Sequence, residues 1–63
     1  MECKIKFYRL QKGYNLRYLS RTSGVSVSYL SDLENGVRTN PSVNTVFKIA
    51  KALGVNITDI YKQ

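Results

Sequence analysis

One ten-residue segment, from position 26 to position 35, carries a dense set of small polar side chains. They are Ser26, Ser28, Tyr29, Ser31, Asp32, Glu34 and Asn35. Hydroxyl, phenol, amide and carboxylate groups donate or accept hydrogen bonds, which suits recognition of a polar partner. Catalysis is disfavoured, because the chain has no histidine and the carboxylates of Asp32 and Glu34, two positions apart on a helix, face different ways. We therefore expect a binding protein and not an enzyme.

The net charge of the chain favours a polyanionic partner. Ten Lys and Arg residues against four Asp and Glu residues give a net charge of +6. Nucleic acid is the first candidate for such a partner and an acidic membrane surface is the second. A membrane-active peptide is disfavoured, because the cationic residues are dispersed along the chain and do not lie on one face of a long helix.

The content of cysteine and histidine limits the cofactors that the chain can hold. The one cysteine, Cys3, cannot form an internal disulfide, and the lack of histidine excludes a structural zinc site of ordinary composition. We expect no cofactor and no metal. The N-terminal segment MECKIKFYRL has no apolar stretch long enough for a signal peptide or a membrane span. We therefore expect a cytoplasmic protein with no membrane partner.

Five short helices are expected to position the polar segment. Apolar spacing, capping residues and glycine stops predict helices over residues 2–12, 16–23, 27–35, 43–53 and 57–61. Asn15, Ser26 and Ser42 are the expected N-caps, and Asn56 with Asp59 resembles a capping box. No segment alternates with a period of two, so we expect no sheet. A chain of 63 residues then forms one compact all-α domain over positions 1–63.

Apolar side chains at helical spacing predict one shared core. The two central helices and the turn between them contribute Leu19, Val25, Leu30 and Leu33. The fourth helix is expected to contribute Val43, Val46, Phe47, Ile49, Ala50 and Leu53. An apolar patch at the edge of the fold, formed by Phe7, Leu16, Ile60 and Tyr61, is a candidate contact surface for a second copy or a partner.

Residues 16 to 36 have the layout of a helix-turn-helix. Two short helices are joined by a tight turn with Gly24, and the second helix exposes the polar segment. In such a motif the second helix enters the major groove of DNA. Arg17, Arg21 and Arg38 lie on the elements nearest this groove and are candidate phosphate contacts, so the affinity is expected to fall steeply with salt.

Five segments carry a resemblance to a known family. They are IKFYR, KGYNL, LSRTSGVSVSYLSDLENG, TNPSVNT and KIAKALGVNITDIY. In order and spacing, over about residues 4–61, these segments are similar to the lambdoid repressor and Cro-like DNA-binding domains, the xenobiotic-response-element type of helix-turn-helix. The pieces KGY, SYLS and TNPS are most similar to the SinR type of bacterial repressor. The resemblance implies a DNA-binding bundle of five helices from a bacterium or phage, acting at the nucleoid.

The resemblance also implies roles for individual positions. Arg9 and Glu34 match an internal ion pair that ties the first helix to the third, a structural role under any function. Three residues match positions that face base edges: Val27, Ser28 and Asp32. Six residues match positions near phosphates: Ser26, Tyr29, Asn35, Arg38, Thr39 and Asn40. Leu16 departs from the family, which often has a phosphate-binding Gln at that position.

The third helix is a poor discriminator of base sequence. It lacks Arg, Lys and Gln, the side chains that make bidentate contacts to guanine and adenine. Val27 can touch a thymine methyl group, Ser28 discriminates weakly, and Asp32 can accept from a cytosine amino group or serve only as a surface charge. Tyr29 is either a phosphate ligand or a half-buried residue at the rim of the core. One copy is therefore expected to bind weakly, with specificity from dimer spacing, water bridges or DNA shape.

The leading functional hypothesis is a transcriptional regulator, acting as a repressor and as a homodimer on double-stranded DNA. A regulatory protein is a further candidate partner. The alternative is a protein-interaction module, such as an antitoxin or adaptor, that uses the same fold. The polar outer face and the charge of +6 favour the first hypothesis, because interaction surfaces more often expose a contiguous apolar patch.

Overall fold

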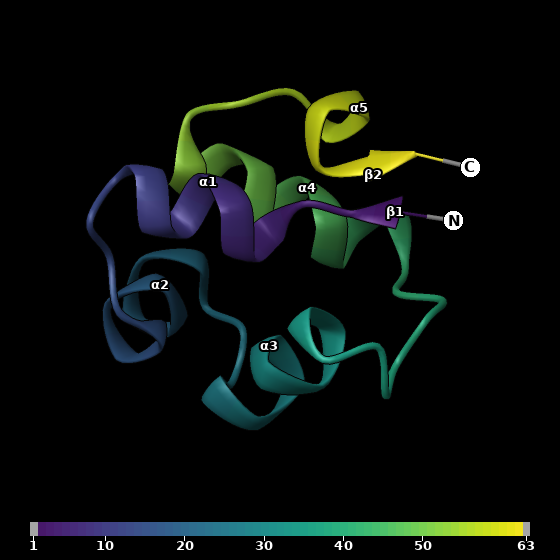
Figure 1. Cartoon of the computed structure of the whole chain (residues 1–63), viewed down its shortest axis with the longest axis horizontal. Helices are drawn as coiled ribbons and strands as arrows, with labels where there is room; N and C mark the ends of the chain where they lie inside the picture. Colours follow the sequence, from purple (N-terminus) through teal and green to yellow (C-terminus); the bar gives the residue numbers. More distant parts are fainter. Residues whose placement is uncertain (1, 63) are drawn as a thin grey trace.

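The computed structural model describes residues 2–62 and contains the five expected helices. In chain order, its elements are β1 (Glu2–Cys3), α1 (Ile5–Gln11), α2 (Leu16–Ser23), α3 (Val27–Glu34), α4 (Val43–Leu53), α5 (Ile57–Ile60) and β2 (Tyr61–Lys62). Figure 1 shows α2 and α3 on one side of the molecule, with α5 and the two chain ends on the other. None of the described helices is long and apolar enough to cross a membrane.

Side-chain caps start the three longest helices, as the sequence predicts. Asn15, Ser26 and Ser42 each accept a hydrogen bond from the backbone N–H three residues further on, at 2.7, 3.2 and 3.2 Å. Such a cap satisfies one of the N–H groups that the first helical turn leaves without a partner. Gly24 ends α2 in the left-handed conformation, with φ of 78°. The capping pattern therefore sets where α2 begins and where the chain turns towards α3.

The core lies between α2, α3 and α4, and α1 and α5 close its remaining side. Its most completely buried side chains are Leu19, Leu30, Ile49, Leu53 and Ile60. The four core residues predicted from the two central helices are confirmed as buried. The core contribution expected from α4 is partly wrong, because Val43 and Phe47 are 74% and 54% exposed. Phe47 follows the buried Val46 and so lies about 100° further round the helix, off the inward stripe.

A short pair of strands joins the two ends of the chain, which corrects the expectation of no sheet. β1 and β2 are antiparallel, with Glu2 opposite Lys62 and Cys3 opposite Tyr61. The backbone N–H of Lys4 extends the pairing by donating to the Ile60 carbonyl at 2.7 Å. Two residues per strand are too few to show an alternating pattern, so the sequence gives no sign of them.

The observed pairing also shortens the terminal helices relative to the prediction. α1 begins at Ile5 rather than at position 2, and α5 ends at Ile60 rather than at position 61. The predicted apolar edge patch is wrong in one member, because Ile60 is completely buried. Phe7 is exposed and Leu16 is half-buried, while the Tyr61 side chain lies outside the residues whose side chains are described.

Candidate nucleic-acid interface

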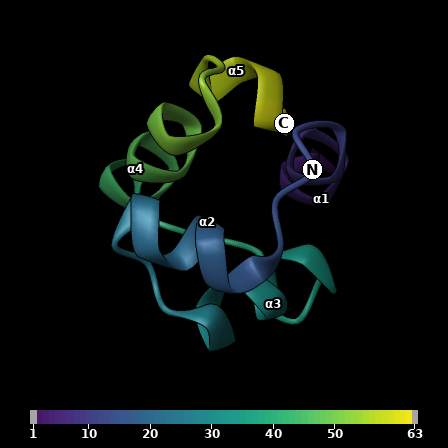
Figure 2. The same ribbon diagram turned by 90° about the vertical axis from the view of Figure 1, so that its left-hand side faces the viewer.

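The turn between α2 and α3 places α3 at the edge of the molecule. Figure 2 shows α3 below α2, on the side away from α5. The turn is fixed from inside, because the Val25 side chain is buried and its N–H donates to the Ser23 hydroxyl at 3.2 Å. Ser26 then caps α3. The geometry is that of a helix-turn-helix, with the first turn of α3 presented to solvent.

The outer face of α3 is polar, but some of its side chains are less exposed to solvent than the sequence predicts. Ser26, Val27 and Ser28 are exposed. Tyr29 and Asp32 are half-buried, and the Tyr29 ring packs against the core. The described structure thus presents Ser26, Val27 and Ser28 at the surface. Tyr29 lies at the rim of the core, half-buried. Their contacts with bases or phosphates remain predictions.

The C-terminal end of α3 folds the following loop back onto the helix. Gly36 has φ of 76°, and its N–H donates to the Leu33 carbonyl at 3.4 Å. The N–H groups of Val37 and Arg38 both donate to the Asp32 carbonyl, at 2.9 and 3.1 Å. The bonds from Gly36 and Val37 are the two bonds of a Schellman motif, which needs a left-handed residue at the position of Gly36. The loop therefore leaves α3 in a defined direction.

The Arg38 side chain returns to α3 and lies over the ring of Tyr29. Its Cζ atom lies 4.5 Å from the centroid of the Tyr29 ring, within the range of a cation–π contact. Sequence reasoning proposed each residue as a separate phosphate contact and missed their pairing. The two positions are nine residues apart and belong to different elements, so no periodic signal in the sequence connects them.

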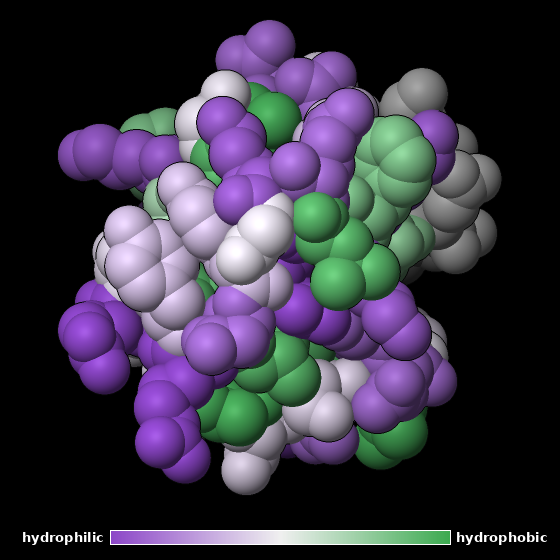
Figure 3. All heavy atoms as spheres, turned by 60° about the vertical axis from the view of Figure 1, so that its left-hand side comes forward, coloured by the Kyte–Doolittle hydropathy of each residue, from purple (hydrophilic) through white to green (hydrophobic). Residues whose placement is uncertain are grey.

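Exposed cations border the helix-turn-helix. Arg17 and Arg21 lie four residues apart on α2 and therefore share one face. Arg38, Thr39 and Asn40 are exposed in the loop after α3. Figure 3 shows a face on which hydrophilic side chains surround small separate groups of apolar ones. A surface of this kind attracts phosphate groups and offers neighbouring apolar contacts.

Asn35, a further predicted phosphate contact, lies at the C-terminal end of α3. It is exposed, and its side-chain amide donates to the Ser31 hydroxyl at 3.3 Å. The amide therefore points back along the helix. Sequence analysis had extended α3 to Asn35, but the helix ends at Glu34 and Asn35 is its C-cap. The prediction for Asn35 is still a proposal, with the side chain already bonded within the protein.

An ion pair behind this surface joins α1 to α3. The Arg9 guanidinium donates from Nε and Nη2 to the two carboxylate oxygens of Glu34, at 2.7 and 3.0 Å. Its Nη1 donates to the Tyr14 carbonyl at 2.8 Å. The two side chains are only 10% and 5% exposed. The hydrogen bonds to Glu34 raise the pKa of Arg9 above its ordinary value, against the opposing effect of burial.

The remaining chemistry-bearing groups give no second site on the described residues. Burial raises the pKa of the Cys3 thiol, and the nearby negative charge of Glu34 adds to this effect, while a backbone hydrogen bond at Ile5 opposes it. A raised pKa leaves less of the reactive thiolate at neutral pH. Within residues 2–62, no group of three or more potential ligand side chains is placed to hold a metal ion.

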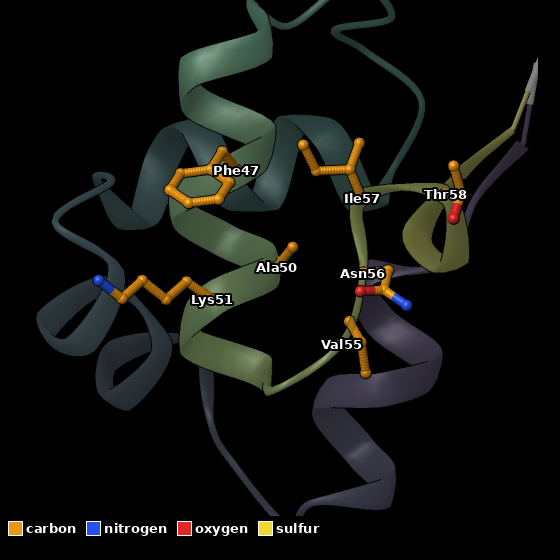
Figure 4. A pocket seen from close by; sticks show the side chains of 7 residues that line it. All are labelled: Phe47, Ala50, Lys51, Val55, Asn56, Ile57 and Thr58. Carbon is orange, nitrogen blue, oxygen red and sulfur yellow. The ribbon is translucent and has the colours of Figure 1, made fainter.

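An apolar hollow lies between α4 and the segment that enters α5 (Figure 4). Its volume is about 480 Å³. It is lined by Phe47, Ala50, Lys51, Val55, Asn56, Ile57 and Thr58. The sequence does not predict this hollow, because the apolar spacing of α4 places Phe47 in the core. The only sign available beforehand was the position of Phe47 at the margin of the inward stripe of α4.

Comparison with known proteins places this geometry in a family. Residues 5–60 match the profile described as helix-turn-helix. The chain belongs to the helix-turn-helix family. The HTH-type transcriptional regulator SlrR of Bacillus subtilis strain 168 is 47% identical to it over 57 residues, which is 90% of this chain and 38% of SlrR.

Solved structures are similar to the helix-turn-helix chain over most of its length. The N-terminal DNA-binding domain of SinR from Bacillus subtilis superposes with a TM-score of 0.88 and 38% identity, over 95% of this chain and 87% of that one. The structure of SinR in complex with DNA superposes with a TM-score of 0.83 and 42% identity, over 86% of each chain. The predicted fold and the predicted resemblance to SinR are thereby confirmed. The chain spans 38% of SlrR and 49% of SinR.

Proposed function

We propose that this helix-turn-helix chain is a transcriptional regulator, a repressor, that inserts α3 into the major groove of double-stranded DNA. The observation that carries the proposal is the exposed first turn of α3, bordered by three exposed arginines on a chain of charge +6. The likeness to regulators, and to SinR solved with DNA, supports it. The proposal includes one domain over residues 1–63, a site at the bacterial nucleoid in the cytoplasm, and no catalytic activity.

The proposed contacts divide into base contacts and phosphate contacts. Val27, Ser28 and Asp32 are assigned to base edges. Seven residues are assigned to phosphates: Ser26, Asn35, Arg17, Arg21, Arg38, Thr39 and Asn40. Tyr29 lies among them in the sequence, with its side chain half-buried and packed against the core. Because none of the base-facing side chains makes a bidentate contact of the Arg–guanine or Asn–adenine kind, phosphates supply most of the affinity of one copy. Two copies on neighbouring half-sites then supply the specificity, so a homodimer on DNA is part of the proposal.

A salt titration combined with binding-site selection tests this function. We expect weak binding by one copy and a logarithmic affinity that falls by about 0.9 per phosphate contact for each decade of salt. Replacing Arg17 and Arg21 together by alanine should lower that slope by about 2. The control is Lys48→Ala, which removes one exposed charge from α4 and should leave the slope nearly unchanged. Binding that is absent, or indifferent to salt, would reject the proposal.

The apolar hollow favours a second candidate function, a module that holds a protein partner. Its lining is largely apolar and includes the half-exposed Phe47, as expected of a site for an apolar side chain of another protein. The same titration separates the two functions. A protein-binding module would leave DNA binding insensitive to both salt and sequence, whereas the regulator requires sensitivity to salt.

A further inference from the structure

Tyr29 has a position that joins the core to the surface. Its ring is half-buried and packs against the core cluster. The Arg38 guanidinium lies over the same ring, 4.5 Å from its centroid. An aromatic ring held by a core changes position less than an exposed one, because its neighbours restrict its rotamers. Tyr29 is thus a fixed platform for an otherwise long and flexible side chain.

The backbone of Arg38 is fixed as well. Its N–H shares the Asp32 carbonyl with that of Val37, at 3.1 and 2.9 Å, just after the left-handed Gly36. The Arg38 side chain is therefore held at its root by the end of α3 and at its tip by Tyr29 in the first turn of α3. Ordering a long side chain before a partner arrives lowers the entropy cost of binding.

The contact with Tyr29 leaves Arg38 exposed to solvent. A guanidinium that lies over a ring can use its face for this contact, because its five N–H donors lie in its own plane and stay free for another partner. Planar N–H pairs fit the oxygens of a phosphate group in a bidentate manner. Residues 27–34 of α3 contain no Lys or Arg, so Arg38 supplies the cation that α3 itself lacks.

We propose that Tyr29 is a positioning residue that holds Arg38 in place to contact a DNA phosphate beside α3. The inference rests on the proposed DNA-binding function. In this proposal the Tyr29 ring holds Arg38, which contacts the phosphate. The resemblance instead places Tyr29 itself near a phosphate. The phenol oxygen would make such a direct contact, whereas the ring face makes the stack. Two substitutions at one position therefore separate the two roles.

Nuclear magnetic resonance on the DNA-free protein tests the stack itself. The ring current of Tyr29 should shift the side-chain proton signals of Arg38 upfield in the wild type and in Tyr29→Phe. The shift should disappear in Tyr29→Leu, which keeps an apolar side chain against the core but removes the ring. Thermal melting of each variant checks that the fold survives. An Arg38 side chain with unshifted signals in the wild type would overturn the inference without any reference to DNA.

DNA binding tests the consequence of the stack. Tyr29→Phe should bind like the wild type, while Tyr29→Leu should bind about two- to fivefold more weakly, the range expected for an exposed cation–π contact. Arg38→Ala should weaken binding further, equally across sequences, and reduce the salt slope by about 1. In the double variant, the Tyr29→Leu effect should vanish, because there is no guanidinium left to position.

A matched cycle with Arg21 provides the control. Arg21 is an exposed arginine on α2, and Tyr29→Leu should weaken binding by the same factor in the Arg21→Ala background as in the wild type. Equal losses in Tyr29→Phe and Tyr29→Leu would assign the contact to the hydroxyl and overturn the proposal. So would additive effects of Tyr29→Leu and Arg38→Ala. A wild type that shows the ring-current shift but fails to bind DNA would instead reject the proposed function.

Discussion

The Arg9–Glu34 ion pair holds α3 against α1. All three guanidinium nitrogens of Arg9 donate hydrogen bonds, two to the Glu34 carboxylate and one to the Tyr14 carbonyl. Both side chains are almost entirely buried. Removing one member of a buried pair leaves the other as an unpaired buried charge, which costs far more than the net value of the intact pair. The pair therefore acts on stability before it acts on recognition.

Glu34→Gln is expected to destabilise the protein by about 3 kcal/mol or more. A chain of this length has a total stability of roughly 3–9 kcal/mol, so the loss is a large fraction of it. Urea denaturation measures the change. Asp32→Asn, on the same helix, is the control and should change stability by about 0.5 kcal/mol or less. Replacing Arg9 and Glu34 together by methionine should recover much of the loss. A cost for Glu34→Gln no larger than the control would contradict the expected role.

At the residue level, the sequence predicts partners only when a resemblance or a short spacing connects them. The pairing of Arg9 with Glu34 came from the family pattern, and the caps at Asn15 and Ser26 came from their distance of three residues to the N–H they accept. The stack of Arg38 on Tyr29 was not predictable in this way. It depends on the Schellman turn at Gly36, which directs the loop back towards α3. That direction is known only from the folded structure.

Among the elements, α3 is a short helix that depends on both its cap and its packing. It has eight residues, with no acidic residue in its first turn and no basic residue in its last turn, so the helix dipole receives no support from its own charges. A helix this short is marginal when isolated. Its start depends on the Ser26 cap and its position depends on Leu30 and Leu33 in the core. Local capping and tertiary packing therefore both contribute to its stability.

Ser26→Ala is expected to destabilise the protein by about 1 kcal/mol, because the N–H of Tyr29 loses its acceptor. Ser28→Ala is the matched control, since Ser28 is an exposed serine two residues later. It should change stability by no more than about 0.5 kcal/mol. Thermal unfolding followed by circular dichroism measures both. If the two variants melt together, the cap on α3 contributes nothing measurable.

The sequence predicts the helices of this fold better than it predicts the strands. The sequence predicts the helices from apolar side chains at helical spacing, and α2, α3 and α4 also have side-chain caps at their starts. The pairing of β1 with β2 was missed because it joins residues at opposite ends of the chain. Only the complete fold brings these ends together, with Ile60 buried between them and the core. Their pairing ties the start of the chain to the end of α5.

At the scale of the whole fold, one copy of the described residues is shorter than the distance between two half-sites on DNA. Its Cα trace measures 26 × 21 × 19 Å, while half-sites one helical turn apart are separated by about 34 Å. Side chains add roughly 3 Å at each end. The longest dimension is then about 32 Å, slightly less than the separation of the half-sites, so two copies would touch at most at their edges and the dimer would be stable mainly on DNA. Exposed apolar side chains are the residues that such a contact needs.

We expect Val43 and Phe47 to belong to that contact, since both are exposed on α4 and Phe47 also lines the apolar hollow. Phe47→Glu should abolish cooperative binding to DNA with two half-sites, because a carboxylate would be buried against apolar groups. It should leave binding to one half-site nearly unchanged. Leu10→Glu is the control, because Leu10 on α1 is an apolar side chain that is 58% exposed, close to the 54% of Phe47, and lies outside the predicted edge patch. Sedimentation velocity on DNA with one and with two half-sites measures both variants. Cooperativity that survives Phe47→Glu, or is lost equally in Leu10→Glu, would place the contact between copies elsewhere.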